Sequence, residues 1–182
     1  MPNLTALTPL GAAHTKSNQI GKITLTEVTD RALASLTCRN ASMAAFNATA
    51  TSMGLVLPQA GHWVDGKQAA IWTGVDQWLI DAPYGPDLAQ ELKAAFGDSA
   101  SVTEQTDAWA RFDISGAAKV DLLERLCPAP TRRMIAGMAT RSTVEHIGCL
   151  LICEEDRFRL MCARSYAGSL HHALTTVANS LR

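Results

Sequence analysis

Charged side chains are scarce in this chain. Aspartate, glutamate, lysine and arginine make up 18% of its 182 residues, whereas a typical soluble protein carries about 25%. Apolar residues account for 47%, so the composition indicates a folded globular protein and excludes extensive disorder. A chain of this length can bury about 70% of its unfolded surface in one domain, and its small share of charge is consistent with large interfaces.

The absence of several other sequence features argues against particular classes of function. Lysine and arginine form no basic cluster and the net charge is −1, which argues against binding to nucleic acid or a lipid surface. No apolar run is long enough to span a bilayer, and we expect no secretory signal because the N-terminus lacks a charged start followed by an apolar core. Five cysteines without the spacing of a disulfide framework indicate reduced thiols in the cytoplasm.

Hydrophobic periodicity predicts an α+β fold that repeats one pattern. Residues 1–20 show little periodicity, and we expect them to form an N-terminal arm that becomes ordered on a partner. Deleting residues 1–16 would then weaken assembly and leave the domain folded. Residues 21–182 are predicted to form a single domain of two pseudo-repeats, about 21–97 and 98–182, each a β2-α-β3-α unit.

Two tripeptides support the duplication, because Trp78-Leu79-Ile80 in the first half matches Phe158-Arg159-Leu160 in the second. The elements themselves follow from hydrophobic periods of two and 3.6 residues. The expected strands are 22–29, 33–38, 62–64, 70–72, 77–80, 101–104, 108–114, 140–146, 149–153 and 158–162, and the expected helices are 40–54, 86–96, 117–126 and 165–181.

The most distinctive local pattern is a strand that stops at Ser115-Gly116 and passes into a helix. A nucleophile elbow would need a Gly-x-Ser-x-Gly frame, and a phosphate cradle would need more glycines or a Lys-Thr pair. Neither is present around Ser115. We therefore interpret Ser115 as a helix cap.

Candidate metal ligands are present but poorly spaced. His146, Cys149, Cys153 and Cys162 could supply four ligands for zinc. However, Cys149 and Cys153 share one predicted strand, about 13 Å apart at the usual rise, so we expect buried, unreactive thiols. On the last helix His171 flanks the apolar stripe, which favours a packing or interface role, and its neighbour His172 points nearly the opposite way.

Four tryptophans, Trp63, Trp72, Trp78 and Trp109, can belong to the core or anchor a partner. Trp78 alternates with polar neighbours on a predicted hairpin, which favours the core. For Trp63, which lies in a predicted loop, both interpretations stay open.

Several segments together resemble the gamma subunit of heterotetrameric sarcosine oxidase. No single segment is specific, and their order and spacing over about residues 8–180 carry the match. The segments are Thr8-Pro9-Leu10, Ala34 through Arg39, Trp72-Thr73-Gly74 with Trp78-Leu79, Arg111 through Gly116, Leu123 through Pro128, Gly137 through Thr140, and Phe158 through Ala167.

The resemblance implies a fold similar to the folate-binding domain of the glycine-cleavage T-protein. It also implies partner subunits alpha, beta and delta, which carry FAD, FMN, NAD, tetrahydrofolate and zinc. Such a complex oxidises sarcosine to glycine and yields hydrogen peroxide with formaldehyde or methylene-tetrahydrofolate. The gamma subunit of this family is not known to hold a cofactor, so the expected role is non-catalytic, in assembly and stability.

Two alternatives stay open. One is a free-standing folate-binding or aminomethyltransferase-like protein, for which Asp113 at a strand end is the best carboxylate. T-proteins carry an Asp-Asp pair before the central hairpin, but the corresponding stretch here begins with Asp65-Gly66, and Asp65 is interpreted as a turn residue. The other is the equivalent subunit of N-methylglutamate dehydrogenase. For this chain alone we expect no catalytic, cofactor-binding or metal-binding residues.

Overall fold

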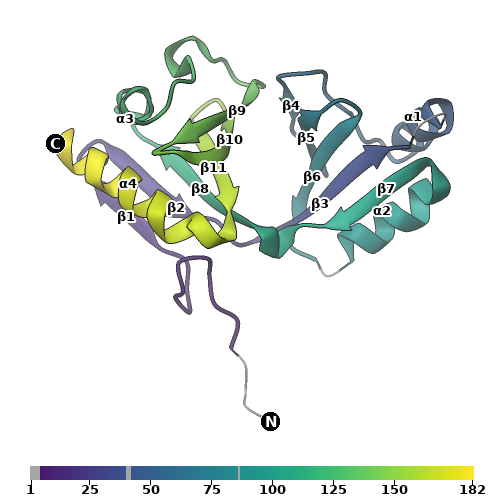
Figure 1. Cartoon of the computed structure of the whole chain (residues 1–182), viewed down its shortest axis with the longest axis horizontal. Helices are drawn as coiled ribbons and strands as arrows, with labels where there is room; N and C mark the ends of the chain where they lie inside the picture. The colour runs from purple at the N-terminus through teal and green to yellow at the C-terminus, as the bar shows by residue number, and fades with distance from the viewer. Residues whose placement is uncertain (1–4, 40–41, 86) are drawn as a thin grey trace. The chain divides into compact units, whose positions relative to one another are not determined.

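The computed structural model describes residues 5–39, 42–85 and 87–182. The chain divides into two compact units (Figure 1), where the sequence predicted a single domain. Unit 2 consists of Asp30–Thr106 with Gly137–Ala139, and unit 1 contains the rest of the described chain. Short 3-10 turns at 97–99, 106–108, 131–133 and 164–166 connect the regular elements.

Unit 1 is built on a six-stranded sheet in the order β1-β2-β8-β11-β10-β9. Helix α4 packs against β1, β2 and β11, and it also contacts α3. Apolar side chains such as Phe112, Leu160 and Leu170 are fully buried. The elements are β1 (Ser17–Ile20), β2 (Ile23–Glu27), β8 (Trp109–Ser115), β9 (Ala139–Val144), β10 (Ile147–Cys153), β11 (Arg157–Ala163), α3 (Lys119–Leu126) and α4 (Ala167–Ser180).

Unit 2 has a five-stranded sheet in the order β4-β5-β6-β3-β7. Its core joins alternate residues of β3 to both helices, with Phe46 of α1 stacked on Trp78 at 5.6 Å and tilted against Phe96 of α2 at 5.0 Å. The elements are β3 (Arg31–Cys38), α1 (Met43–Ser52), β4 (Trp63–Val64), β5 (Ala69–Gly74), β6 (Gln77–Pro83), α2 (Leu88–Phe96) and β7 (Ala100–Glu104).

The two units repeat one topology. The order β3-α1-β4-β5-β6-α2 in unit 2 corresponds to β8-α3-β9-β10-β11-α4 in unit 1. Strand register supports the tripeptide match: Trp78 lies opposite Leu36, Phe158 lies opposite Ile114, and Leu36 and Ile114 are each the sixth residue of their strands. The structure therefore has the expected duplicated α+β fold.

The repeat boundaries differ from the expected 21–97 and 98–182. Strand β2 pairs with β8 and belongs to unit 1, whereas β7 pairs with β3 and belongs to unit 2. Each sheet thus takes a strand that the local pattern had assigned to the other half, β2 between β1 and β8 in unit 1 and β7 at the edge of unit 2. The helix expected over 117–126 begins at Lys119, and the helices expected from 40 and 86 begin at Met43 and Leu88; Asn40 and Pro86 themselves lie outside the described residues.

The N-terminal segment is attached to unit 1 itself. Residues Ser17–Ile20 form β1, which pairs with β2. Before it, the buried carboxylate of Glu27 accepts hydrogen bonds from the backbone N–H of Leu10 at 2.9 Å and of Lys16 at 3.2 Å. Arg164 also donates to the carbonyl of Leu7 at 2.7 Å. The described part of the segment therefore has contacts within its own chain, and the expectation that a partner orders residues 1–20 stays a prediction.

Candidate functional site

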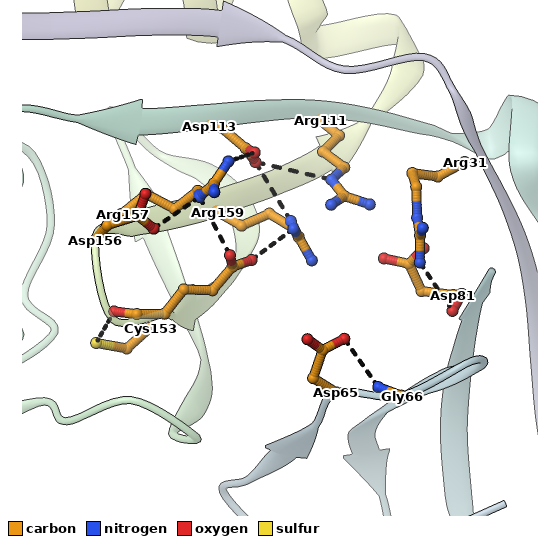
Figure 2. Close-up of polar contacts among 11 residues, drawn as sticks. Arg31, Asp65, Gly66, Asp81, Arg111, Asp113, Cys153, Asp156, Arg157 and Arg159 are labelled. Carbon is orange, nitrogen blue, oxygen red and sulfur yellow. Dashed lines mark hydrogen bonds and ion pairs between the residues drawn. The ribbon is translucent and has the colours of Figure 1, made fainter. Parts of the chain in front are cut away.

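The densest group of charged side chains lies on one face of the unit 1 sheet. Asp113 on β8 lies directly opposite Arg159 on β11, and its carboxylate is 3.3 Å from Arg159 Nε, 3.3 Å from Arg157 Nη1 and 3.8 Å from Arg111 Nε. Glu154, after β10, reaches Arg159 Nη2 at 2.5 Å and Arg157 Nε at 3.2 Å. Figure 2 shows Arg111 and Asp113 from β8 converging with Arg157 and Arg159 from β11.

A third carboxylate, that of Asp156, lies 3.0 Å from Arg157 Nε, so the network pairs three arginines with three acidic residues. Burial raises the pKa of Glu154, and the positive charge of Arg159 works against that rise. Asp113, the carboxylate singled out as a possible base, is engaged by three guanidinium groups. A carboxylate held this way is an ion-pair acceptor that helps to fix the neighbouring strands.

Unit 2 holds a smaller ion pair on its own sheet. Arg31 Nε lies 2.6 Å from the carboxylate of Asp81, which is completely buried, and Arg31 Nη2 donates to the Asp81 carbonyl at 3.2 Å (Figure 2). A buried carboxylate needs a charged partner with good hydrogen-bond geometry. Arg31 therefore compensates the buried charge of Asp81, and sequence reasoning missed the pair because its residues are separated by 50 positions.

The Ser115-Gly116 junction has a packing explanation. Ser115 ends β8 opposite Arg157 and Thr24, and α3 begins only at Lys119 with Ala118 as its N-cap, so the interpretation of Ser115 as the cap is wrong. Gly116 has φ of 100°, and a Cβ there would meet the carbonyl oxygen of Lys22 at 2.2 Å. Glycine is required because the β1–β2 turn approaches the junction closely.

The cysteines are buried thiols, as expected. Cys149 lies opposite Cys162 across β10 and β11, and burial raises the pKa of Cys149 to about 12 and of Cys162 to about 11. His146 is exposed in the turn between β9 and β10. In the described parts of the chain, no three histidine, cysteine or acidic side chains gather closely enough to hold a metal ion.

The two adjacent histidines have separate environments. His171 packs against the ring of Phe112 with centroids 5.9 Å apart, as its predicted packing role requires. Burial lowers its pKa, with a further contribution from Lys16. His172 is exposed and lines a groove of about 750 Å³ between α4 and the turn that precedes β10.

The groove was not predicted from the sequence. Its rim includes Tyr166, which is 52% exposed, and the turn residues Glu145 and His146. Both turn residues have positive φ, 47° and 68°, a conformation that glycine or asparagine adopts at lower cost in a two-residue hairpin turn. Glutamate and histidine are not typical of such a turn, so the sequence provided no indication of this turn or of the groove beside it.

The remaining candidates take structural positions. Asp65 accepts a hydrogen bond from the backbone N–H of Gly66 at 2.9 Å, which confirms it as a turn residue. Trp78 belongs to the core, where its indole N–H donates to the carbonyl of Pro58 at 2.9 Å. Trp63 is half-buried in β4. None of the described helices has the length and apolarity that crossing a membrane would need.

The chain is similar in sequence to two curated proteins. It is 35% identical over 112 residues to sarcosine oxidase subunit gamma of Corynebacterium sp. (strain P-1), a match covering 58% of this chain and 55% of that protein. The subunit gamma of an Arthrobacter species is 34% identical over 110 residues, 57% of this chain and 54% of its own. The chain thus spans about half the length of the curated relatives it matches. No protein-family model matches it.

A solved structure extends this similarity over most of the chain. A chain of heterotetrameric sarcosine oxidase from Corynebacterium sp. U-96, solved in complex with pyrrole 2-carboxylate, superposes with a TM-score of 0.78 at 25% identity, covering 87% of this chain and 84% of that one. The present chain is similar to the sarcosine oxidase gamma subunits in sequence and in fold. The resemblance predicted from the sequence is confirmed.

A more distant neighbour confirms the expected fold. Aminomethyltransferase T of the glycine cleavage system from Bartonella henselae matches with a TM-score of 0.61 at 12% identity, over 82% of this chain and 44% of that protein. At this identity the match shows the shared fold alone. Of the two carboxylates considered for folate, Asp65 accepts a hydrogen bond within its own turn and Asp113 is held by three arginines.

Proposed function

We propose that this chain is a non-catalytic gamma-type subunit of a heterotetrameric sarcosine oxidase in the cytoplasm, where it contributes to assembly and stability. The observation that carries the proposal is the likeness to a chain of such a complex over 87% of this chain, together with its sequence match to gamma subunits. The partners are then the alpha, beta and delta subunits, which carry FAD, FMN, NAD, tetrahydrofolate and zinc.

The arrangement of reactive groups supports a binding role. A catalytic site brings an acid, base or nucleophile within reach of one substrate atom. Three of the candidates have structural surroundings here: Asp113 is held by arginines, the thiols are buried, and His171 packs against Phe112. We therefore infer that this chain contributes to the complex by binding other subunits.

The experiment uses the chain with an affinity tag, co-expressed with the alpha, beta and delta subunits. The eluate is measured for bound flavin by absorbance and for sarcosine-dependent hydrogen peroxide. We expect both signals from the co-purified complex and no sarcosine turnover from the chain purified alone. A tagged chain that elutes without flavin subunits under all salt conditions would refute the proposal.

A second measurement separates the free-standing alternative. The isolated chain is titrated with tetrahydrofolate while the fluorescence of its four tryptophans is recorded. We expect no saturable change. Saturable binding at micromolar concentrations would favour the folate-binding alternative instead, and turnover of N-methylglutamate by the co-purified complex would reassign the substrate.

A further inference from the structure

The groove beside helix α4 combines an apolar floor with polar groups along its rim. The floor is formed by Ile147, Ala173 and Val177, which are buried or half-buried. The rim comes from the turn between β9 and β10 and from the exposed side of α4 with the residue before it. We call this the α4 groove, and its rim side chains are those of Glu145, His146, Tyr166, Ser169, His172 and Thr176.

The α4 groove is long and open. Its helical wall runs from Tyr166 to Val177, a distance of about 16 Å at the usual helical rise, and its other wall is a single hairpin turn. Sites for small molecules enclose most of the ligand surface. A trough of this length instead accommodates about five residues of extended chain. The shape therefore favours a peptide segment as the occupant over a free small molecule.

Polar groups on the rim are open to such an occupant. Within the parts of the chain that the structure describes, the side chains of Glu145, Ser169 and Thr176 form no hydrogen bond or ion pair. By contrast, the hydroxyl of Thr175 on the same helix donates to the carbonyl of His171 at 2.9 Å. The rim thus presents one carboxylate and two hydroxyl groups whose hydrogen bonds a partner can complete.

The chemistry of the rim selects a positively charged group. The lining residues include one glutamate and neither lysine nor arginine. An ammonium or guanidinium group can pair with the carboxylate of Glu145, donate to the hydroxyls and lie against the ring of Tyr166, which is 52% exposed. An acidic segment would be repelled by Glu145, and an apolar segment would cover this carboxylate without a partner for its charge.

The backbone at Glu145 gives an independent reason to assign it a role in binding. Its φ of 47° is a left-handed conformation, which costs glutamate more than glycine, asparagine or aspartate. The corresponding turn of unit 2, between β5 and β6, places Asp76 at φ of 54° directly after Gly74 and Val75. Because folding alone does not favour glutamate at such a position, a binding role for its carboxylate accounts for its presence.

We propose that the α4 groove is the docking site for an extended, basic segment of another subunit of the oxidase, with a lysine or arginine side chain of that segment paired with Glu145. This inference rests on the proposed function. All of the lining residues belong to unit 1, so the site is complete within one compact unit.

The test changes the charge at residue 145 in the full-length tagged chain. Glu145→Gln and Glu145→Lys are each co-expressed with the alpha, beta and delta subunits, as is the wild type, and the captured flavin is measured. The matched controls are Glu155→Gln and Glu155→Lys, because Glu155 is also an exposed glutamate in a hairpin turn, at the other end of β10. We expect about threefold less captured flavin for Glu145→Gln, about tenfold less or lower for Glu145→Lys, and values within about twofold of the wild type for both controls.

A further substitution separates binding from folding. Glu145→Asn removes the charge and introduces a residue that adopts positive φ at lower cost. We therefore expect its melting temperature to rise by about 2 °C while the captured flavin falls about threefold. Lost capture in a variant more stable than the wild type cannot result from misfolding. Capture equal to that of the wild type in Glu145→Asn and Glu145→Lys would overturn the docking site and leave the proposed function standing.

The remaining outcomes point to other occupants. No captured flavin with the wild type would remove both proposals. Calorimetric titration of the isolated chain with methylguanidinium tests a free cation: saturable binding that Glu145→Lys abolishes, while subunit capture persists, would overturn the inference. An isolated chain that sediments as a dimer, and as a monomer after Glu145→Lys, would identify a second copy as the occupant and also overturn it. Thermal melts check folding, and Glu145→Gln decides the question if Glu145→Lys fails to fold.

Discussion

Replacing Glu27 with alanine should release the N-terminal segment from unit 1. The Glu27 side chain is buried, and both of its oxygens accept backbone hydrogen bonds, from Leu10 at 2.9 Å and Lys16 at 3.2 Å. A hydrogen bond to a charged group contributes about 1.5–3 kcal/mol. Because one of the two is long, we expect Glu27→Ala to cost about 3 kcal/mol of local stability, and Glu27→Gln, which keeps one acceptor oxygen, about half of that.

Hydrogen exchange measured by mass spectrometry tests this prediction. A loss of about 3 kcal/mol corresponds to roughly 100-fold faster exchange in peptides that cover residues 8–16. Peptides from β3 in unit 2 serve as the control and should not change. Exchange in residues 8–16 that stays within twofold of the wild type after Glu27→Ala would show that the carboxylate does not hold the segment. The same geometry predicts that deletion of residues 1–16 destabilises unit 1, in contrast to the expectation from the sequence.

Three further perturbations follow from single contacts. The pKa of His171 is lowered in the folded chain, so its contribution to stability is complete above its unfolded pKa of about 6.5 and is lost as the pH falls through the folded value. The substitution His171→Gln should therefore reduce the loss of unfolding free energy between pH 7 and pH 5. A pH dependence equal to that of the wild type would contradict this. Asp81→Asn breaks the buried pair with Arg31 and should cost about 3 kcal/mol in urea unfolding, whereas a cost below about 1 kcal/mol would mean that the pair contributes little net stability. Gly116→Ala forces a Cβ against the carbonyl of Lys22 and should cost more than about 2 kcal/mol; a melting temperature equal to that of the wild type would refute the packing explanation.

The regular elements could be predicted from the sequence because each carries its own hydrophobic period. Strand β2 and helix α2 are examples, since their buried residues follow the periods of their element types. Strand β1 was missed because Ser-Asn-Gln-Ile contains one apolar residue. Local patterns also do not specify which strands pair, so the exchange of β2 and β7 between the two sheets was not predictable.

The role of Asp113 in the candidate site likewise depends on strand pairing, which the local sequence does not specify. Asp113 was identified as a notable carboxylate, but its role depends on Arg157 and Arg159, which lie 44 and 46 residues away. Those arginines face Asp113 only because β8 and β11 pair in this register. A shift by one residue would move Arg159 to the opposite face of the sheet. Without the pairing, the difference between a general base and an ion-pair acceptor could not be read from the sequence.

The duplication separates what the fold requires of a helix from what it leaves open. Helices α1 and α3 occupy corresponding places in two copies of one topology, so the fold makes the same demand on both: an apolar stripe against the sheet and helix-forming residues elsewhere. That demand is met by Phe46 and Ala50 in α1 and by Leu122, Leu123 and Leu126 in α3. The outer faces are not constrained by the fold, and they differ: α3 carries four charged residues, whereas α1 carries alanine, asparagine, threonine and serine. Hydrophobic periodicity therefore predicts the buried stripe of each helix and leaves the chemistry of its outer face open.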